Sequence, residues 1–146
     1  REALTVLTPH WGECRRLFPE LINTIGDRLD LATAISQQTQ SILVLKGACT
    51  AIAAPGQPTW VNPTSTPALA RGGSGDVLTG LMGGLLAQAQ AQQRELHPAV
   101  LTAVGWHAQA ALRLETARSP LGVDAFTLAN SLCPPALEPP SQKPGF

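Results

Sequence analysis

The sequence predicts an α/β fold in which helices cover a mixed sheet of short strands. Runs rich in Val, Ile and Leu alternate along the chain with longer segments in which apolar residues recur at helical spacing, and this alternation is typical of the class. The 146 residues, 44% of them hydrophobic, suffice for one buried core but not for a second full domain. We therefore expect one globular unit.

Four short segments have the composition of strands, namely 4–7, 42–45, 49–53 and a weaker run at 59–61. The second and third of these are separated only by Lys46, Gly47 and Ala48. Because a parallel crossover needs about a dozen or more residues, we expect these two segments to form an antiparallel hairpin. The sheet is therefore predicted to be mixed at one side.

Helical segments are predicted between and after the strands. They are expected at 12–18, at 27–40, at 77–89, from 97 onward, and at 125–132. Asp27 and Asp124 stand where capping residues are favoured, and Pro98 stands in the first turn of its helix. The pair Pro134 and Pro135 is expected to end the last helix.

Glycine and proline mark the remaining features of the chain. Gly80, Gly83 and Gly84 lie inside the 77–89 helix, where each costs about 1 kcal/mol relative to Ala, and we expect close backbone packing there. Segment 55–75 is rich in Pro, Gly, Ser and Thr, and is expected to be a loop ordered by what it binds. Residues 138–146 are expected to form a Pro-rich, disordered tail.

Composition excludes several classes of function. Ten Lys and Arg balance ten Asp and Glu, so bulk charge offers no attraction for nucleic acid. Cys14, Cys49 and Cys133 form no CxxC pair, which argues against a zinc ribbon or a disulfide framework and favours a reducing cytoplasm. No apolar run reaches the roughly 18 residues of a membrane span, and the opening residues lack the basic-then-apolar pattern expected of a leader. Because Arg1 is followed at once by a strand, we expect the numbering to begin inside a longer protein.

The most informative motif is Gly-Gly-Ser-Gly-Asp, from Gly72 to Asp76, directly before the helix that Val77 opens. Glycines let successive backbone N–H groups turn toward a ligand, and the helix start adds partial positive charge, so the motif predicts an anion cradle. It is neither a Walker loop nor a GxGxxG turn. The alternative is a Gly-rich turn in which Asp76 is an ordinary N-cap.

Asp76 stands beside this expected anion site, where bound phosphate would repel a carboxylate. Its presence is explained if magnesium intervenes, or if the carboxylate faces a substrate hydroxyl and accepts its proton during phosphoryl transfer. Lys46, which follows a strand, is suited to contact a phosphate as a point charge, while Gly47 and Ala48 allow close backbone approach. The alternative for Lys46 is a solvated residue at the sheet edge.

Histidine and cysteine supply further candidates. His10 follows the first strand, and because ligands of open α/β sheets lie beyond the carboxyl ends of strands, we expect it at the rim of a crevice. The alternative is a cap of a local turn, with Glu13 as a first-turn carboxylate. His107 in an Ala-rich helix, His97 before a proline and Cys49 are interpreted as structural.

Taken in order, four stretches strongly resemble the ADP-dependent NAD(P)H-hydrate dehydratases of the ribokinase-like superfamily. They are Leu7 to Glu13, Val44 to Ala48, Asn62 to Thr64 and Ala70 to Gly80. The resemblance covers roughly residues 4 to 133, and the ordered set makes it specific, since GGSGD alone fits many sugar and vitamin kinases. It implies a three-layer αβα, Rossmann-like fold that is incomplete, because the family's catalytic domain is nearly twice this length. Residues 1–137 are then the C-terminal part of that domain.

The resemblance also implies the site. Asp76 is expected to be the catalytic base and, with His10, to bind substrate. Nucleotide binding is expected at Lys46, Gly47, Ala48, Cys49, Thr50, Gly72, Gly73, Ser74 and Gly75. No residue is expected to be a dedicated metal ligand, although Mg²⁺ is expected to accompany the nucleotide.

The implied activity is that of a hydro-lyase in nicotinamide nucleotide repair. Hydrated NADH and NADPH in the 6S form are converted to NADH and NADPH, while ADP, or ATP in its place, acts as co-substrate and ADP yields AMP and phosphate. The implied protein is cytoplasmic, forms a homo-oligomer at full length, and binds neither nucleic acid nor membrane.

Two departures and two alternatives accompany this resemblance. Ser65 and Thr66 stand where family members commonly have Gly-Asn, so the loop path is expected to differ there, and the earlier half of the family's domain is absent.

The nearest alternative is a vitamin or sugar kinase of the same superfamily, in which Asp76 deprotonates an alcohol and the product keeps the phosphate. A second alternative is a non-catalytic nucleotide-sensing module that uses the same cradle.

Overall fold

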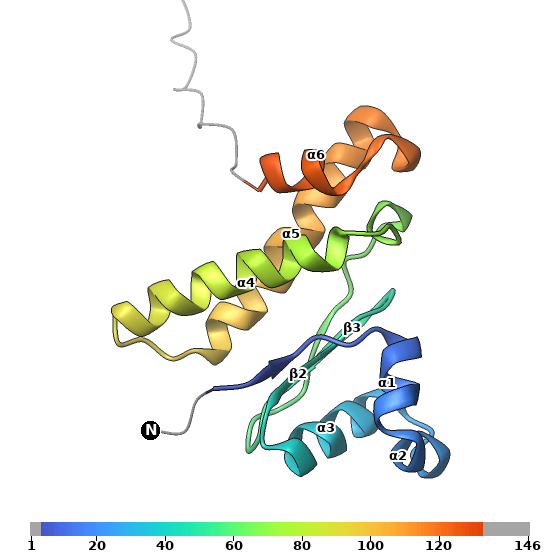
Figure 1. Cartoon of the computed structure of the whole chain (residues 1–146), viewed down its shortest axis with the longest axis vertical. Coiled ribbons are helices and arrows are strands. Elements are labelled where there is room, and N and C mark those ends of the chain that lie inside the picture. The colour runs from blue at the N-terminus through green and yellow to red at the C-terminus, as the bar shows by residue number, and fades with distance from the viewer. Residues whose placement is uncertain (1–3, 133–146) are drawn as a thin grey trace, which may run out of the picture.

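A computed structural model describes residues 4–132 of the chain (Figure 1). Cys133, the Pro134 and Pro135 pair and the tail 138–146 lie outside the described residues. The elements follow in the order β1 (Val6–Leu7), α1 (Trp11–Leu17), α2 (Pro19–Thr24), α3 (Arg28–Thr39), β2 (Ile42–Leu45), β3 (Thr50–Ala53), β4 (Trp60–Asn62), η1 (Pro67–Leu69), α4 (Ser74–Ala91), α5 (His97–Arg118), η2 (Pro120–Gly122) and α6 (Ala125–Asn130).

The described strands form one sheet in the order β1-β2-β3-β4. β1 runs parallel to β2, with Val6 opposite Ile42. β2 and β3 are antiparallel, and so are β3 and β4. The predicted hairpin and the predicted mixed sheet are therefore confirmed, and the weaker run at 59–61 is the strand β4.

Helices cover both faces of this sheet, as Figure 1 shows. Ile42 and Val44 of β2 point to the face packed against α4 and α5, in a core with Met82, Val100 and Val104. Leu43 and Leu45 point to the opposite face, where Leu31 and Ile35 of α3 and Cys14 of α1 complete a second core. A strand buried on both faces has no polar alternation, which explains the continuous apolar run at 42–45. The predicted three-layer αβα arrangement is confirmed.

Capping residues fix where the helices begin. The Asp27 carboxylate accepts from the amides of Leu29 and Asp30 at 2.7 and 3.0 Å, so it starts α3 as predicted. Asp124 accepts from the Thr127 amide at 2.7 Å and starts α6. None of the helices within residues 4–132 has the length and apolarity to cross a membrane.

Two expectations are wrong in detail, and one helix was not predicted. Helix α4 begins at Ser74 rather than at Val77, because the left-handed backbone of Gly73, with φ of 87°, turns the chain directly into the helix. The short helix α2 was not expected, since its six residues carry too little periodicity. A Cβ built at Gly80, Gly83 or Gly84 meets nothing within 4 Å, so these glycines are not explained by close packing within the described residues.

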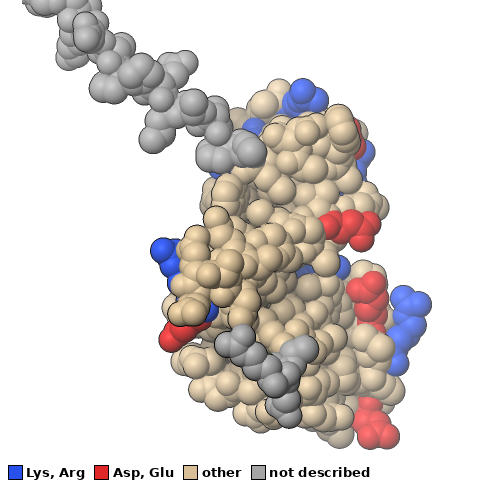
Figure 2. All heavy atoms as spheres, turned by 60° about the vertical axis from the view of Figure 1, so that its left-hand side comes forward, with Lys and Arg blue, Asp and Glu red and all other residues tan. Residues whose placement is uncertain are grey.

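Charge is spread thinly over the surface. Figure 2 shows Lys and Arg scattered among uncharged residues on one face, with Asp and Glu close by and no extended region of one sign. This agrees with the equal numbers of basic and acidic residues in the chain. Any attraction for an anion must therefore come from a local arrangement of groups.

Candidate functional site

A cavity of about 910 Å³ lies between the ends of β1 and β2 on one side and the start of α4 on the other. Nearly all of the residues predicted to act at a site line it. They are His10, Lys46, Gly47, Ala48, Thr50, Gly72, Gly73, Ser74, Gly75 and Asp76. Cys49 is the exception, because it is exposed on the β2–β3 turn and does not line the cavity.

His10 and Lys46 are brought together by the parallel pairing of β1 with β2. The pairing continues past the strands as an isolated bridge between these two residues, and the Lys46 amide donates to the Pro9 carbonyl at 2.9 Å. Both side chains therefore leave the sheet at the carboxyl ends of neighbouring strands. This is the edge at which open α/β sheets bind their ligands.

His10 also caps helix α1. Its Nδ1 accepts from the Glu13 amide at 3.1 Å, while its own amide donates to the Glu13 carboxylate at 2.7 Å. That hydrogen bond from the His10 amide is the largest cause that lowers the pKa of Glu13. The capping role and the position at the rim of the cavity, which the sequence offered as alternatives, therefore occur together. Because Nδ1 is an acceptor, the ring proton of neutral His10 is on Nε2.

The Gly72 to Asp76 motif begins α4 and leaves several amides without a carbonyl partner. The Asp76 and Val77 amides donate to the Gly73 carbonyl at 3.1 Å, and the Ser74 amide donates to Arg71 at 3.3 Å. Among residues 4–132 no carbonyl accepts from the amides of Gly72, Gly73 and Gly75. These three residues line the cavity beside the helix start, where an anion is favoured.

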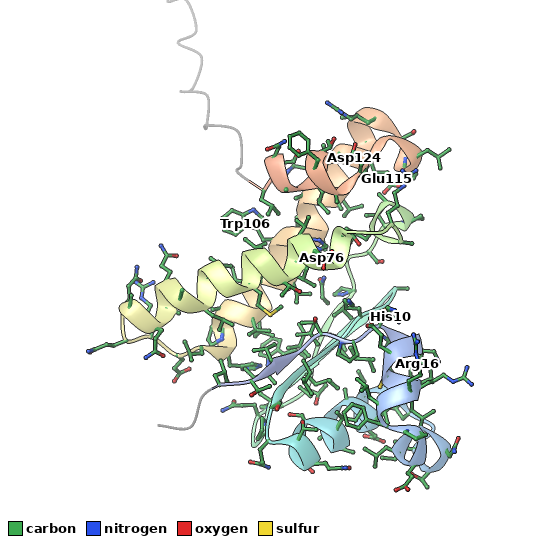
Figure 3. The ribbon with its side chains drawn as sticks, in the orientation of Figure 1. His10, Arg16, Asp76, Trp106, Glu115 and Asp124 are labelled. Carbon is green, nitrogen blue, oxygen red and sulfur yellow. The ribbon has the colours of Figure 1, made fainter. Side chains whose placement is uncertain are left out.

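Asp76 lies in the first turn of α4 and is exposed to the cavity. Gly73, and not Asp76, is the N-cap of the helix, so the ordinary-cap alternative is excluded. The carboxylate accepts no hydrogen bond from any described residue, and it is the one acidic group among the described residues that line the cavity. Figure 3 shows Asp76 and His10 on elements on opposite sides of this space. Asp76 is thus free to accept a proton from a bound molecule.

Lys46 reaches from the sheet to the glycine motif. Its Nζ atom lies 3.1 Å from the point where a Cβ on Gly75 would stand. No described carboxylate is within ion-pair distance of this ammonium, since the one pair found in residues 4–132 joins His10 and Glu13. An unpaired ammonium beside unpaired amides is an arrangement that binds phosphate or another anion.

The sequence indicates a structural role for His107, and the structure shows in addition that this residue lines the cavity. The side chain is 5% exposed, lines the cavity, and its Nε2 donates to the Ser74 carbonyl at 3.0 Å. Burial is the main cause that lowers its pKa, and nearby Lys46 lowers it further. The imidazole therefore holds the first turn of α4 against α5 in its neutral form.

Other residues in the site or directly beside it were not predicted as site residues. Arg28 donates to the carbonyls of Leu45 and Lys46 behind the β2–β3 turn, and Arg71 donates to the Leu121 carbonyl at 2.7 Å beside the glycine motif. The polar groups of Asn62, Thr64, Ser65 and Thr66 and the apolar side chains of Leu69, Leu78 and Val104 complete the lining. The Asn62 to Thr64 stretch and Arg71, which stands in the stretch from Ala70 to Gly80, belonged to the resemblance, whereas Arg28 at the start of α3 carries no local signal.

A resident metal ion is not supported by the donor set. No group of three or more His, Cys, Asp or Glu side chains is close enough to hold a metal within the described part of the chain. Mg²⁺ does not need such a cage, since it commonly retains several waters and binds through one carboxylate and substrate phosphates. The cavity therefore fits Mg²⁺ only as a companion of a bound phosphate compound, with Asp76 as the available carboxylate.

Comparison with known proteins gives consistent matches. The family model described as NAD(P)H-hydrate dehydratase matches residues 1–134. A bifunctional NAD(P)H-hydrate repair enzyme of Thermosynechococcus vestitus is 55% identical over 130 residues, 89% of this chain and 25% of the relative. The ADP-dependent (S)-NAD(P)H-hydrate dehydratase of Bacillus subtilis is 44% identical over 87 residues, 59% of this chain and 32% of the relative.

Solved structures match in shape as well as in sequence. The ADP/ATP-dependent NAD(P)H-hydrate dehydratase of Bacillus subtilis, co-crystallised with ATP and Mg²⁺ and soaked with CoA, has a TM-score of 0.79 and 38% identity over 90% of this chain and 48% of that one. A ribokinase-like protein of Enterococcus faecalis has a TM-score of 0.72 and 28% identity over 87% of this chain and 42% of that one. The chain thus spans about half of these structures and a quarter of the Thermosynechococcus relative.

Proposed function

The chain belongs to the NAD(P)H-hydrate dehydratase family, and we propose on that premise that it carries the phosphoryl-transfer site of an ADP-dependent hydro-lyase. Its fold is ribokinase-like, as in the solved relatives. The proposed reaction converts the 6S hydrates of NADH and NADPH to NADH and NADPH and releases AMP and phosphate. The observation that carries the proposal is the meeting of Lys46, three unpaired glycine amides and Asp76 at one cavity.

Nucleotide is proposed to bind at the β2–β3 turn and the glycine motif. The Lys46 ammonium and the amides of Gly72, Gly73 and Gly75 supply charge and hydrogen-bond donors for phosphate oxygens. Gly47, Ala48 and Thr50 line the same side of the cavity. The Bacillus subtilis relative crystallised with ATP and Mg²⁺ supports an adenine nucleotide as co-substrate, with Mg²⁺ carried by its phosphates.

The chemistry divides a difficult step into two easier ones. Hydroxide is a poor leaving group, so the ring hydroxyl first attacks the terminal phosphoryl group of ADP, the bond to the AMP oxygen breaks, and the hydroxyl proton passes to Asp76. In the second step the ring nitrogen lone pair expels phosphate, a proton leaves the neighbouring ring carbon, and the ring double bond forms. In such a loose transition state, positioning and charge stabilisation outweigh base strength.

The chain's own groups have distinct roles in this proposal. The glycine amides and Lys46 hold the phosphoryl group while its charge redistributes, and Asp76 accepts the proton of the attacking hydroxyl. His10 lies across the cavity with its Nε2 atom 3.4 Å from the Glu13 carboxylate, and it is proposed to contact a polar group of the hydrated ring. His107 keeps the first turn of α4 in place from behind.

The rest of the domain is proposed to be supplied by further sequence. Residues 1–137 are the C-terminal part of the catalytic domain and 138–146 a Pro-rich tail, which accords with a chain that spans 48% of the solved Bacillus subtilis structure. The complete protein is proposed to act in the cytoplasm as a homo-oligomer. Its partners are the hydrated dinucleotide and an adenine nucleotide, and not nucleic acid or membrane.

One assay separates this proposal from the two alternatives. The complete protein, meaning this chain with any sequence that precedes or follows it, is mixed with hydrated NADH and ADP. Return of the dihydronicotinamide absorbance together with AMP and phosphate supports the dehydratase. A stable phosphorylated product identifies a kinase, and binding of ADP without turnover identifies a sensing module; either result contradicts the proposal.

A further inference from the structure

Arg28 occupies a position that its own helix disfavours. It is the first residue of α3, directly after the capping Asp27. The N-terminal end of a helix carries partial positive charge, so a cation is less favourable there than at the other end. Residues that break a local rule are expected where the rest of the structure, or the function, compensates for them.

The compensation for Arg28 is a pair of hydrogen bonds to the turn that follows β2. Its Nη2 donates to the carbonyl of Leu45 at 2.8 Å and to the carbonyl of Lys46 at 2.9 Å. The guanidinium also lies over the ring of Trp11, 5.9 Å from the ring centre, at the start of α1 next to His10. Arg28 therefore contacts both segments that bring His10 and Lys46 to the cavity.

The β2–β3 turn has few other restraints. Residues 47–49 take part in no backbone-to-backbone hydrogen bond with any described residue. Apart from Arg28, the one side-chain contact to the backbone of this turn within residues 4–132 is a long one, from the Thr50 hydroxyl to the Gly47 carbonyl at 3.3 Å. The conformation of the turn thus depends largely on the guanidinium behind it.

Gly47 is the counterpart of Arg28 in this arrangement. A Cβ at Gly47 would stand 2.5 Å from Nη2 and 2.9 Å from Nη1 of Arg28. The sequence suggested that Gly47 lacks a side chain so that a ligand can approach the backbone. The structure shows that the Arg28 guanidinium occupies the space that a Gly47 side chain would fill. The glycine and the arginine, 19 positions apart in the chain, are therefore expected to depend on each other.

We propose that Arg28 is a positioning residue that holds the β2–β3 turn so that the Lys46 ammonium meets the anion cradle. Arg28 does not line the cavity, and it acts through the carbonyl of Lys46 itself. The Lys46 side chain leaves the turn at that residue and ends against Gly75. The inference rests on the proposed nucleotide site, and it adds Arg28 to the residues that hold this site in place.

The test compares four variants of the complete protein with the unaltered one. Arg28→Met removes the donors, Arg28→Lys keeps the charge but replaces the planar guanidinium, whose Nη2 reaches both carbonyls, by an ammonium, and Gly47→Ala displaces the guanidinium. Arg15→Met, an exposed arginine without a side-chain hydrogen bond among the described residues, is the matched control. The measurements are the Kd for ADP and the hydrogen exchange of amides 47–50 without nucleotide.

Arg28→Met is expected to raise the Kd for ADP by about ten-fold or more and to speed exchange at 47–50. Arg28→Lys is expected to recover only part of the loss, and Arg15→Met to change neither quantity. Gly47→Ala is expected to act like Arg28→Met, and the double variant to be no worse than Arg28→Met alone. An arginine that merely stabilises the fold is expected to leave the Kd for ADP of the folded protein unchanged.

Two results would overturn the inference. One is a folded Arg28→Met protein whose Kd for ADP stays within about two-fold of the unaltered value; should that variant not fold, Arg28→Lys and Gly47→Ala give the same comparison. The other is a double variant whose losses simply add. If the unaltered protein binds no ADP, the proposed function fails, whereas the exchange at 47–50 still decides whether Arg28 holds the turn.

Discussion

The Nζ atom of Lys46 lies 3.1 Å from where a Cβ of Gly75 would stand, so the end of the sheet and the start of α4 meet at one ammonium group. The two residues are joined by no helix or strand, and they come together only because β2 and α4 pack in one core. Gly75 also has an amide with no carbonyl partner among the described residues. A cation and a residue with an unpaired N–H, brought together in this way, form the basis of an anion site.

Replacing Lys46 by Met is expected to raise the Kd for ADP by about ten-fold or more, because the uncharged side chain no longer meets the phosphates. The salt dependence of ADP binding is expected to fall as well, since one charge contact is lost. Titration calorimetry at two salt concentrations measures both effects. Arg94→Met, three residues beyond the C-terminal end of α4, is the control, and equal effects of the two substitutions would contradict the role of Lys46.

Replacing Gly73 by Ala is expected to destabilise the protein. The backbone of Gly73 has φ of 87°, and an added Cβ would stand 2.8 Å from the Cβ of Ala125. The left-handed conformation alone costs about 1–2 kcal/mol for a residue with a side chain, and the contact with α6 adds to it. Urea unfolding measures the loss. Gly72→Ala is the matched control, because its Cβ meets nothing within 4 Å and its φ is not positive.

Replacing Asp76 by Asn is expected to lower turnover on the order of 100-fold or more, because the amide cannot accept the hydroxyl proton. Binding of ADP is expected to persist, since the ammonium and the glycine amides remain. Steady-state rates with hydrated NADH and a separate ADP titration distinguish the two effects. Glu20→Gln, on the exposed side of α2, is the control. A folded Asp76→Asn protein with near-full activity would remove Asp76 from the mechanism.

Stability is expected to depend on the protonation of His107. Burial lowers its pKa in the folded protein, whereas the unfolded chain keeps the ordinary value near 6.5. Above pH 6.5 the imidazole is neutral in both the folded and the unfolded protein, so it contributes no pH dependence to the free energy of unfolding. As the pH falls below it, the unfolded chain binds a proton first, so the free energy of unfolding decreases, by about 1.4 kcal/mol for each unit separating the two pKa values.

His107→Gln tests this assignment, because glutamine can donate to the Ser74 carbonyl but does not titrate. Denaturant unfolding of the two proteins between about pH 5 and pH 8 gives the comparison. The unaltered protein is expected to lose stability relative to the variant only in the acidic part of this range. Parallel curves for the two proteins would show that His107 does not titrate differently on folding.

Local sequence signals predicted the sheet and much of the site. Three signals were informative: the apolar run 42–45, the three-residue separation from the next strand, and the glycine motif before α4. Each reflects a physical requirement of the local backbone, so that residues close together in the sequence reveal it. The position of His10 at the rim of the cavity then follows, because ligands of open α/β sheets lie beyond the carboxyl ends of strands. These features could be predicted because their causes lie within a few residues in the chain.

Contacts between distant segments could not be predicted. Arg28 meets the carbonyl of Lys46 across 18 residues, and His107 meets that of Ser74 across 33. Neither contact leaves a pattern in the sequence, since both donors bind backbone carbonyls that every residue possesses. The inference that Gly80 is closely packed was wrong for a related reason, because the cost of a helical glycine does not indicate what lies beside it.

The central claim is that the phosphoryl group passes to the ring oxygen at the cradle before that oxygen leaves. Hydrated NADH that carries oxygen-18 in its ring hydroxyl tests it most directly, with ADP, the complete protein and mass analysis of the released phosphate. The account predicts that the label is found in phosphate, because the carbon–oxygen bond breaks only after the oxygen has been phosphorylated. Label in water, with unlabelled phosphate, would contradict it.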